Sequence, residues 1–478
     1  MRSLRNTALS GVVTGSRVLS VAVVMLWVAR ALGPAGFGSF TYALTLATVL
    51  AVIPDYGFSL QLVARITRAP GHTRQLLRAA SWAKGYLAFV AALGGVAWAL
   101  IYRPPADVLR ISVVLFVAAM ALSFGQLHSY VFRGNDRFEF DAITSAIQNF
   151  ALVIGVLVVY LVDGGPMGIA CAYLAARLLY LAITSSLLRR QARDTDTAPA
   201  LTPLSMLREG FPYGVHTALG VLCLNLDSLI LAAYQDNTTV GHYQAGMRLV
   251  FASALLPEVL TSGLFPTLAR AFGIGESEQA VRVGRMMHRY LLLSGGLAAA
   301  VFLVAPVLIR RLLFGASYAA LDTLLPWFGL VIFLRYASTT YGAAITAVGA
   351  QRSRTLALLG AAAISLAADF WLIPRFGLPG ALAASVSTQL VVLLLYAGLT
   401  RRYVGGWLID QRAATGLAVL ALMGGFAWRL SVLAPHIVAI LGPVVLAAFT
   451  VALAIPSTEW RRLRQAVRGA PAAATYGT

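Results

Sequence analysis

The sequence predicts an all-α integral membrane protein with about fourteen transmembrane helices, forming two parallel six-helix lobes around a central cavity plus two C-terminal helices. Composition is the first reason, because charged residues make up 12% of the 478 positions, against roughly 25% in a soluble domain. Apolar windows long enough to span a bilayer recur along the chain, and part of their pattern is repeated. In lipid, helices satisfy every backbone polar group within one segment.

Apolar windows place the helices in order, and Gly/Pro turns such as Gly33-Pro34 separate many of them. The predicted helices lie near residues 7–30, 37–56, 77–102, 107–132, 140–162, 166–188, 205–234, 239–265, 287–312, 319–347, 354–372, 378–400, 412–430 and 433–455. Arg2 and Arg5 precede the first apolar run. Because that run is as long as a full span, we expect a retained helix rather than a cleaved signal peptide.

The positive charges between these helices indicate an orientation. One set of alternate loops holds only seven cations, namely Arg30, Arg103, Arg110, Arg310, Arg311, Arg375 and Arg429. Most of the other cations lie in the opposite set, which includes both ends of the chain. The positive-inside bias therefore predicts cytoplasmic termini and an even helix count. Since the net charge of +19 is spread over short loops rather than one basic face, we expect no nucleic-acid partner.

An internal repeat relates the two halves of the chain. Gly38, Phe40, Leu46, Pro54 and Asp55 match Gly241, Tyr243, Leu249, Pro257 and Glu258 at a constant offset of 203 residues. Weaker echoes pair Gly134 and Arg137 with Gly349 and Arg352, and Gly168 with Gly380. The repeat predicts an N-terminal lobe (1–190), a cytoplasmic linker (191–204), a C-terminal lobe (205–402), helices 13 and 14 (403–456) and a basic cytoplasmic tail (457–478). Parallel repeats of this kind bind substrate between the lobes.

Ionisable residues inside the predicted spans are costly, and they usually face a cavity or a partner. Arg17, Arg248 and Arg335 lie mid-span on polar helix faces, and we expect at least two of them to line the cavity and bind substrate. Arg177 has apolar neighbours, which leaves open whether it binds substrate or pairs within its own lobe. Asp227 is either an ion or proton coupling site or a counter-ion for an arginine.

Two acidic residues and the cysteines are assigned plainer roles. Asp55 and Glu258 each follow a proline near a predicted cytoplasmic helix end, and we assign both a gating or structural role. Cys171 and Cys223 lie in apolar stretches without metal-ligand spacing, so we expect no metal site and no cofactor.

The excess of intramembrane arginine over acid predicts an electropositive cavity. Guanidinium binds phosphate through parallel hydrogen bonds and keeps its charge when it is buried. The sequence therefore predicts an anionic substrate, and in particular one that carries phosphate.

Three segments carry a resemblance to a known family. RALGPAGFGSFTYALTLATVLAVIPDYGF (30–58) resembles the first external turn and second helix of polysaccharide flippases in the multidrug/oligosaccharidyl-lipid/polysaccharide exporter superfamily. LNLDSLILAAYQDNTTVGHYQAGMRLV (224–250) resembles their helix 7–8 hairpin, and LFPTLAR (264–270) its cytoplasmic exit. The likeness extends over the first twelve helices.

The resemblance implies an O-antigen-type (Wzx-type) flippase in the bacterial cytoplasmic (inner) membrane. Such proteins move undecaprenyl-diphosphate-linked oligosaccharide to the outer leaflet by alternating access. In related lipid II flippases, arginines of helices 1 and 8 lie in the cavity, and Arg17 and Arg248 occupy comparable places here. The expected partners are the lipid-linked oligosaccharide, membrane lipids, and the polysaccharide polymerase and glycosyltransferases of the same pathway, with the chain acting as a monomer.

Three alternatives compete with this interpretation. A drug or cation exporter of the same superfamily shares the fold. A membrane glycosyltransferase or polymerase would need a larger external loop or an external acidic motif, and the first external turn, Gly33-Pro34-Ala35-Gly36, carries no carboxylate. A scaffold without transport activity would not need intramembrane arginines. We therefore expect a transporter and assign no catalytic residue.

Overall fold

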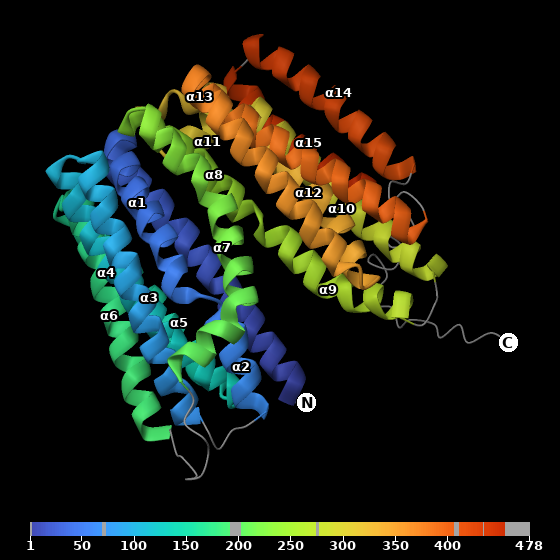
Figure 1. The fold of residues 1–478 in the computed structure, drawn as a ribbon. Helices are drawn as coiled ribbons and strands as arrows, with labels where there is room; N and C mark the ends of the chain where they lie inside the picture. Colours follow the sequence, from blue (N-terminus) through green and yellow to red (C-terminus); the bar gives the residue numbers. More distant parts are fainter. Residues whose placement is uncertain are drawn as a thin grey trace, which may run out of the picture. The chain divides into compact units, whose positions relative to one another are not determined.

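Helices make up nearly all of the structure, a computed structural model that describes residues 2–68, 73–191, 202–273, 277–405, 411–433 and 435–454. Within these ranges the chain forms fifteen α-helices and one short 3-10 helix, and it contains no strand (Figure 1). Side chains are described for most of these residues, although not for residues 2–22. The predicted all-α class is confirmed.

Two helices are too long to cross a bilayer only once. α1 (Arg2–Asp55) and α13 (Gln351–Val404) each contain 54 residues, whereas about 20 residues span the hydrocarbon core. Each helix is broken at one glycine, Gly33 with a φ of 63° and Gly377 with a φ of 59°. Glycine adopts positive φ without a steric penalty, so these are the positions at which one span gives way to the next. The predicted boundaries on either side of both glycines agree with these breaks.

Nine helices in the described part of the chain are long and apolar enough to cross a membrane, or ten if one bent pair counts as a single span. This number does not confirm the predicted fourteen. In this number α13 is counted once, although it contains two stretches of spanning length, and α1 is counted only from Val23 onwards. The finding nevertheless establishes a multi-pass membrane protein.

Two predicted helices are each two helices in the structure, and proline is the cause in both cases. The window 239–265 covers most of α8 (Asn237–Ser253) and the first part of α9 (Leu255–Gly273), while 287–312 covers the end of α10 (Ser277–Val304) and most of α11 (Pro306–Leu313). Proline has no amide hydrogen and its ring clashes with the carbonyl four residues earlier.

The break before α9 shows how the lost hydrogen bond is replaced. Pro257 leaves the carbonyl of Ser253 without its helical donor, and the hydroxyl of Tyr336 donates a hydrogen bond to that oxygen instead. Tyr336 belongs to α12 (Leu321–Ala347), so the broken turn is held by a neighbouring helix.

A short helix that the sequence analysis did not predict follows α1. α2 (Phe58–Arg68) begins after Tyr56 and Gly57, which both have positive φ. Phe58, Leu62 and Ile66 are fully buried at intervals of four residues, so one face of α2 packs into the core. The apolar window missed this helix because it is only 11 residues long and carries Arg65 and Arg68.

The chain divides into two compact units. Unit 1 comprises Met1–Ala252, Leu313–Tyr318 and Ala362–Ala384, and unit 2 comprises Ser253–Leu312, Ala319–Ala361 and Ser385–Thr478. The helices of unit 1 not yet named are α3 (Thr73–Tyr102), α4 (Ala106–Gly134), α5 (Phe138–Leu161), α6 (Gly165–Gln191) and α7 (Pro203–Tyr234), together with the 3-10 helix η2 (Ala316–Tyr318). Unit 2 also contains α14 (Gln411–Leu433) and α15 (Pro435–Ala454). These two units are defined by contacts between residues and not by the sequence repeat. The predicted division into lobes of six, six and two helices therefore stays a prediction.

Two glycines that the repeat pairs with each other meet inside unit 1. A β-carbon on Gly38 of α1 would lie 1.7 Å from the carbonyl oxygen of Asn237, at the start of α8. A β-carbon on Gly241 of α8 would lie 1.9 Å from the carbonyl oxygen of Pro34. Glycine at both positions therefore allows the two helix backbones to touch, as small residues do at helix crossings in membranes.

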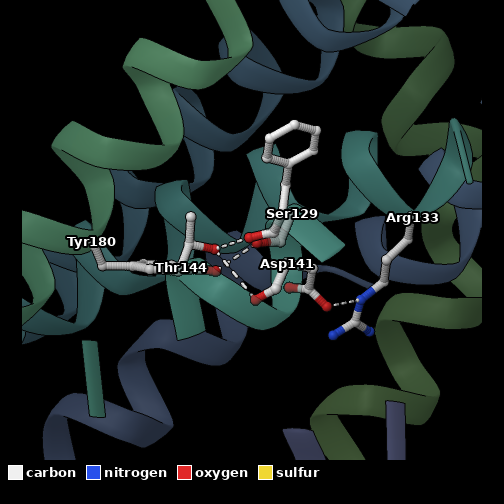
Figure 2. Close-up of polar contacts among 6 residues, drawn as sticks. Ser129, Arg133, Asp141, Thr144 and Tyr180 are labelled. Atoms are coloured by element: carbon white, nitrogen blue, oxygen red, sulfur yellow. Dashed lines mark hydrogen bonds and ion pairs between the residues drawn. The ribbon is translucent and has the colours of Figure 1, made fainter. Parts of the chain in front are cut away.

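A polar cluster fixes the end of α4 against α5 and α6 (Figure 2). Arg133 Nε donates to Asp141 Oδ2 at 2.7 Å, and the hydroxyls of Ser129 and Tyr180 lie 2.6 Å apart. Gly125 leaves room for the Tyr180 ring, which a β-carbon there would approach at 2.5 Å. These contacts join three helices within unit 1.

Candidate functional site

Arg177 lies against a tyrosine ring in unit 1, and the charge of Arg248 from another helix acts on the same tyrosine. Tyr173 and Arg177 lie one turn apart on α6, and the guanidinium carbon of Arg177 is 5.2 Å from the centre of the Tyr173 ring. The charge of Arg248, on α8, also acts on the Tyr173 hydroxyl. Tyr173 is buried. Neither arginine forms an ion pair with any residue that the structure describes.

A glutamine holds Arg248 from one helical turn away. Gln244 Oε1 accepts a hydrogen bond from Arg248 Nη2 at 3.2 Å, and Gln244 Nε2 lies 3.5 Å from the hydroxyl of Thr45 on α1. Arg248 Nε is buried and has no hydrogen-bond partner in the described part of the chain. A buried donor without a partner is costly, so this atom is suited to an acceptor that a substrate brings.

Asp227 of α7 is held by donors rather than by an arginine. Its Oδ2 accepts a hydrogen bond from the hydroxyl of Tyr243 on α8, and its Oδ1 accepts from the amide nitrogen of Ser228 at 2.7 Å. The Ser228 hydroxyl is 3.3 Å from the same oxygen. The structure shows no ion pair for Asp227 among its described residues, and both predicted roles of Asp227 stay predictions.

A second carboxylate of unit 1 is close enough to Asp227 for the two charges to interact. Asp369, on the part of α13 that belongs to unit 1, is buried and interacts electrostatically with Asp227. Ser365, one turn earlier on the same helix, hydrogen-bonds to Asp369. Two acidic side chains in one apolar unit repel each other when both are charged, so such a pair is suited to taking up a positive charge.

The remaining predicted site residues are not brought into this cluster by the described contacts. The Arg17 side chain lies outside the described residues. Arg335 lies on α12 in unit 2, is half-buried, and forms no ion pair with a described residue. Glu258 is exposed in the first turn of α9. Their predicted roles stay predictions.

Asp55 forms a separate cluster with the single lysine of the chain. Lys84 Nζ of α3 lies 2.9 Å from Asp55 Oδ1, and the hydroxyl of Ser123 on α4 donates to the same oxygen. The Lys84 side chain is 1% exposed and that of Asp55 is 34% exposed. The pair joins the end of α1 to two neighbouring helices, which is the kind of contact that the predicted gating or structural role requires.

Sequence reasoning missed Asp369, Tyr243 and Tyr173 as members of the site. Asp369 could have been identified from the sequence, because it is a lone carboxylate inside a predicted apolar span, as Asp227 is. The two tyrosines gave no signal, since aromatic residues in apolar helices are ordinarily packing residues. In the described part of the chain, no group of three His, Cys, Asp or Glu residues is placed to hold a metal ion.

Comparisons with known proteins agree with this architecture. The profile of a family described as polysaccharide biosynthesis protein matches residues 3–272. No curated protein matches the sequence. Solved structures do match it over most of its length, at low sequence identity.

Three of these structures show the fold. A multidrug resistance transporter of the MATE family in the MOP superfamily, inward-facing, has a TM-score of 0.63 at 15% identity, with 81% of this chain and 94% of that chain covered. The lipid II flippase MurJ, inward closed, has a TM-score of 0.63 at 13% identity, with 92% and 98% covered. A MOP superfamily transporter from Pyrococcus furiosus has a TM-score of 0.53 at 14% identity, with 84% and 96% covered. The chain therefore has the fold of MOP superfamily transporters, as the resemblance predicted.

Proposed function

Because this chain belongs to the polysaccharide biosynthesis protein family, we propose that it is a flippase for undecaprenyl-diphosphate-linked oligosaccharide. It carries the glycan from the cytoplasmic to the outer leaflet of the bacterial inner membrane by alternating access. Its termini lie in the cytoplasm, and its partners are the glycosyltransferases and polymerase of the pathway. The observation that carries the proposal is the pair Arg177 and Arg248, which are both half-buried, both act on Tyr173, and form no ion pair with a carboxylate among the described residues.

The chemistry of this pair fits a diphosphate better than other ligands. Two half-buried arginines that form no ion pair with a described residue are compensated together by a ligand that carries more than one negative charge. A diphosphate provides that charge and several acceptor oxygens for the planar guanidinium groups. Arg248 Nε, a buried donor without a described partner, provides one further hydrogen bond. We propose the same substrate-binding role for Arg17 and Arg335, the other two arginines predicted to line the cavity.

Coupling is the proposed role of Asp227. Its carboxylate is held by Tyr243 and Ser228 and interacts electrostatically with Asp369. A proton or another monovalent cation relieves the repulsion between the two acids, so its arrival and departure provide a means of driving the transport cycle. We assign Asp55 and Glu258 to gating.

A drug or cation exporter is the second candidate. The acidic pair Asp227 and Asp369 favours it, because a cationic substrate would be attracted to two carboxylates. One of the similar structures is a multidrug resistance transporter, and the similarity is that of the fold alone. The exporter does not explain two half-buried arginines that form no ion pair with any described residue.

Binding of a short prenyl diphosphate tests the proposal. Purified protein is titrated with farnesyl diphosphate, with farnesol as the uncharged probe. We expect Arg248→Ala and Arg177→Ala each to weaken diphosphate binding by about 10- to 100-fold, since a hydrogen bond to a charged group contributes about 1.5–3 kcal/mol. Binding of farnesol is expected to stay unchanged.

Arg110→Ala is the matched control, because Arg110 is an exposed arginine 4.0 Å from Asp107. Its removal changes the net charge by the same amount and leaves the site intact. Equal diphosphate affinity in Arg248→Ala, Arg177→Ala and the unmodified protein would contradict the proposal. Binding of cationic drugs without binding of diphosphate would favour the exporter.

A further inference from the structure

One side of α3 is exposed along nearly the whole helix. Only 6% of the residues in its apolar window are buried, whereas 17–78% are buried in the other candidate spans of the described chain. The buried residues of α3, Ala80 and Ala83 among them, lie on the opposite side and pack against unit 1. In a membrane, the exposed side of α3 is therefore in contact with lipid.

The residues on this exposed side change in character along the helix. Two arginines come first, two amphipathic aromatic residues follow, and apolar side chains come last. In order, they are Arg74, Arg78, Trp82, Tyr86, Phe89 and Leu93. Their spacing of three or four residues places neighbours next to each other on one helix face, and the ring centroids of Trp82 and Tyr86 are 6.4 Å apart. These six residues, the lipid face of α3, follow the order of a phospholipid from its phosphate to its acyl chains.

The length of α3 places the two arginines at the level of lipid headgroups. Trp82 and Tyr102 are both exposed and lie 20 residues apart, and 20 helical residues span about 30 Å, the thickness of the hydrocarbon core. Aromatic residues of this kind mark the two membrane interfaces. Arg78 then lies about 6 Å beyond the hydrocarbon core and Arg74 about 12 Å beyond it, in the headgroup layer and at its outer edge.

The two arginines form a positive site without a described counter-charge. Both are exposed and lie one helical turn apart, and because side chains on a helix lean toward its N-terminus, the Arg78 guanidinium is directed toward Arg74. Neither forms an ion pair with a residue that the structure describes, and α3 contains no acidic residue. Like charges at this spacing destabilise a helix slightly, so helix stability does not explain them. A phosphate between the two guanidinium groups accepts charge-assisted hydrogen bonds from both.

We propose that the lipid face of α3 is a binding site for an anionic phospholipid. The phosphate lies on the two arginines, the glycerol backbone lies beside the two aromatic rings, and one acyl chain follows the apolar residues. Charge selects the occupant, because a zwitterionic phospholipid carries an ammonium that the arginines repel, whereas phosphatidylglycerol carries only the negative charge. No residue of this face belongs to the candidate transport site, so the proposal does not depend on the proposed substrate.

Lipid binding by the purified full chain tests the proposal. Native mass spectrometry of the protein released from detergent micelles counts the bound lipids while dioleoyl phosphatidylglycerol is added, or phosphatidylethanolamine with the same chains. We expect one phosphatidylglycerol per chain to bind about 25-fold more tightly than phosphatidylethanolamine, since each arginine near the lipid surface contributes about fivefold. The preference is expected to fall about fivefold in Arg74→Ala and in Arg78→Ala, and to vanish in the double variant.

Two other variants serve as controls. Arg110→Ala removes one exposed arginine from α4 and is expected to keep the full preference. Trp82→Ala removes an interfacial ring without changing the charge, so we expect it to weaken the binding of both lipids by about two- to tenfold and to leave their ratio unchanged. The unfolding temperature of each variant confirms that it is folded.

The conditions of the test separate this site from two simpler explanations. Arginines near the ends of spans also set the orientation of a chain in the membrane, but detergent micelles have no sides, so a purely orienting role predicts no lipid preference there. Glycerol 3-phosphate carries a phosphate without acyl chains and is expected not to displace bound phosphatidylglycerol. Displacement at concentrations equal to those of the lipid would identify a general anion site and overturn the proposal.

Three further results would also overturn the proposal. The first is equal affinity of the unmodified protein for the two lipids, and the second is a preference that persists in the folded double variant. The third is a lipid-free dimer that Trp82→Ala dissociates, which would assign the lipid face of α3 to a second copy of the chain.

Discussion

The buried pair between Lys84 and Asp55 predicts an asymmetry between its two single variants. Lys84 is 1% exposed and Asp55 is 34% exposed, so the two charges lose water to very different extents. Asp55→Asn leaves the ammonium buried without an anion. Lys84→Met leaves a carboxylate that is one-third exposed and still accepts from Ser123. We therefore expect Asp55→Asn to destabilise the fold more than Lys84→Met does.

The magnitude follows from the geometry of the pair. Unit charges 2.9 Å apart attract by about 6 kcal/mol at an effective dielectric constant of about 20, and burial offsets a large part of this energy. Removing one partner of a buried pair costs about 3–5 kcal/mol. We expect Asp55→Asn to lower the free energy of unfolding by about 4–5 kcal/mol, near the upper limit of this range. We expect Lys84→Met to lower it by about 2–3 kcal/mol, because the Asp55 carboxylate that remains is partly exposed and still hydrogen-bonded. The double variant is expected to cost at least about 2 kcal/mol less than the sum of the two.

The assay is a double-variant cycle on the free energy of unfolding in mixed micelles. Lys84→Met, Asp55→Asn and the double variant are compared with the unmodified protein under the same conditions. Equal costs for the two single variants would refute the argument from burial. Additivity to within about 0.5 kcal/mol would refute the pairing itself.

Two further predictions concern stability near the start of α8. Gly241→Ala would place a β-carbon 1.9 Å from the carbonyl oxygen of Pro34, and we expect it to lower the free energy of unfolding by about 1–3 kcal/mol or more. At Gly85 a β-carbon would meet no atom within 4 Å, so we expect Gly85→Ala to be neutral or stabilising. The unfolding temperatures of both variants test this. Asp236 accepts a hydrogen bond from the amide nitrogen of Thr239 at 3.1 Å, and hydrogen bonding to Thr239 lowers the pKa of this exposed carboxyl below its ordinary value of 3.8. This hydrogen bond contributes about 1 kcal/mol or less to the stability of the fold, and the contribution is present above pH 3.8 and is lost as the pH falls through the lowered pKa. Asp236→Ala removes the contribution at neutral pH. Unfolding of the unmodified protein and of Asp236→Ala across a pH series measures the difference.

Most of the fold could be predicted from the sequence because hydropathy is local. A membrane span is recognised from about 20 consecutive residues, and breaks such as Gly33 and Gly377 carry their own signal. α2 escaped because a short amphipathic helix resembles a polar loop in a hydropathy window. The predicted window 239–265 contained the signal for its own division, Pro257, although a proline inside a membrane helix does not always break it.

Only some residues of the candidate site could be predicted from the sequence, because their roles depend on which helix faces pack against each other. Arg248 and Asp227 were found as charges inside apolar stretches, a property of one segment at a time. That the charges of Asp369 and Asp227 interact, and that Arg248 acts on the same tyrosine as Arg177, depends on how distant segments pack. The sequence left the role of Arg177 open, and its binding role stays a proposal.

Movement of a labelled lipid-linked oligosaccharide across the membrane of proteoliposomes tests the central claim most directly. The unmodified protein, Arg248→Ala and the exposed control Arg110→Ala are reconstituted in parallel, and the label remaining in each leaflet is followed by a membrane-impermeant quencher. The account predicts rapid flipping by the unmodified protein and by Arg110→Ala, with flipping by Arg248→Ala slowed about tenfold or more. Flipping by Arg248→Ala at the unmodified rate, or no flipping of the lipid by the unmodified protein, would contradict it.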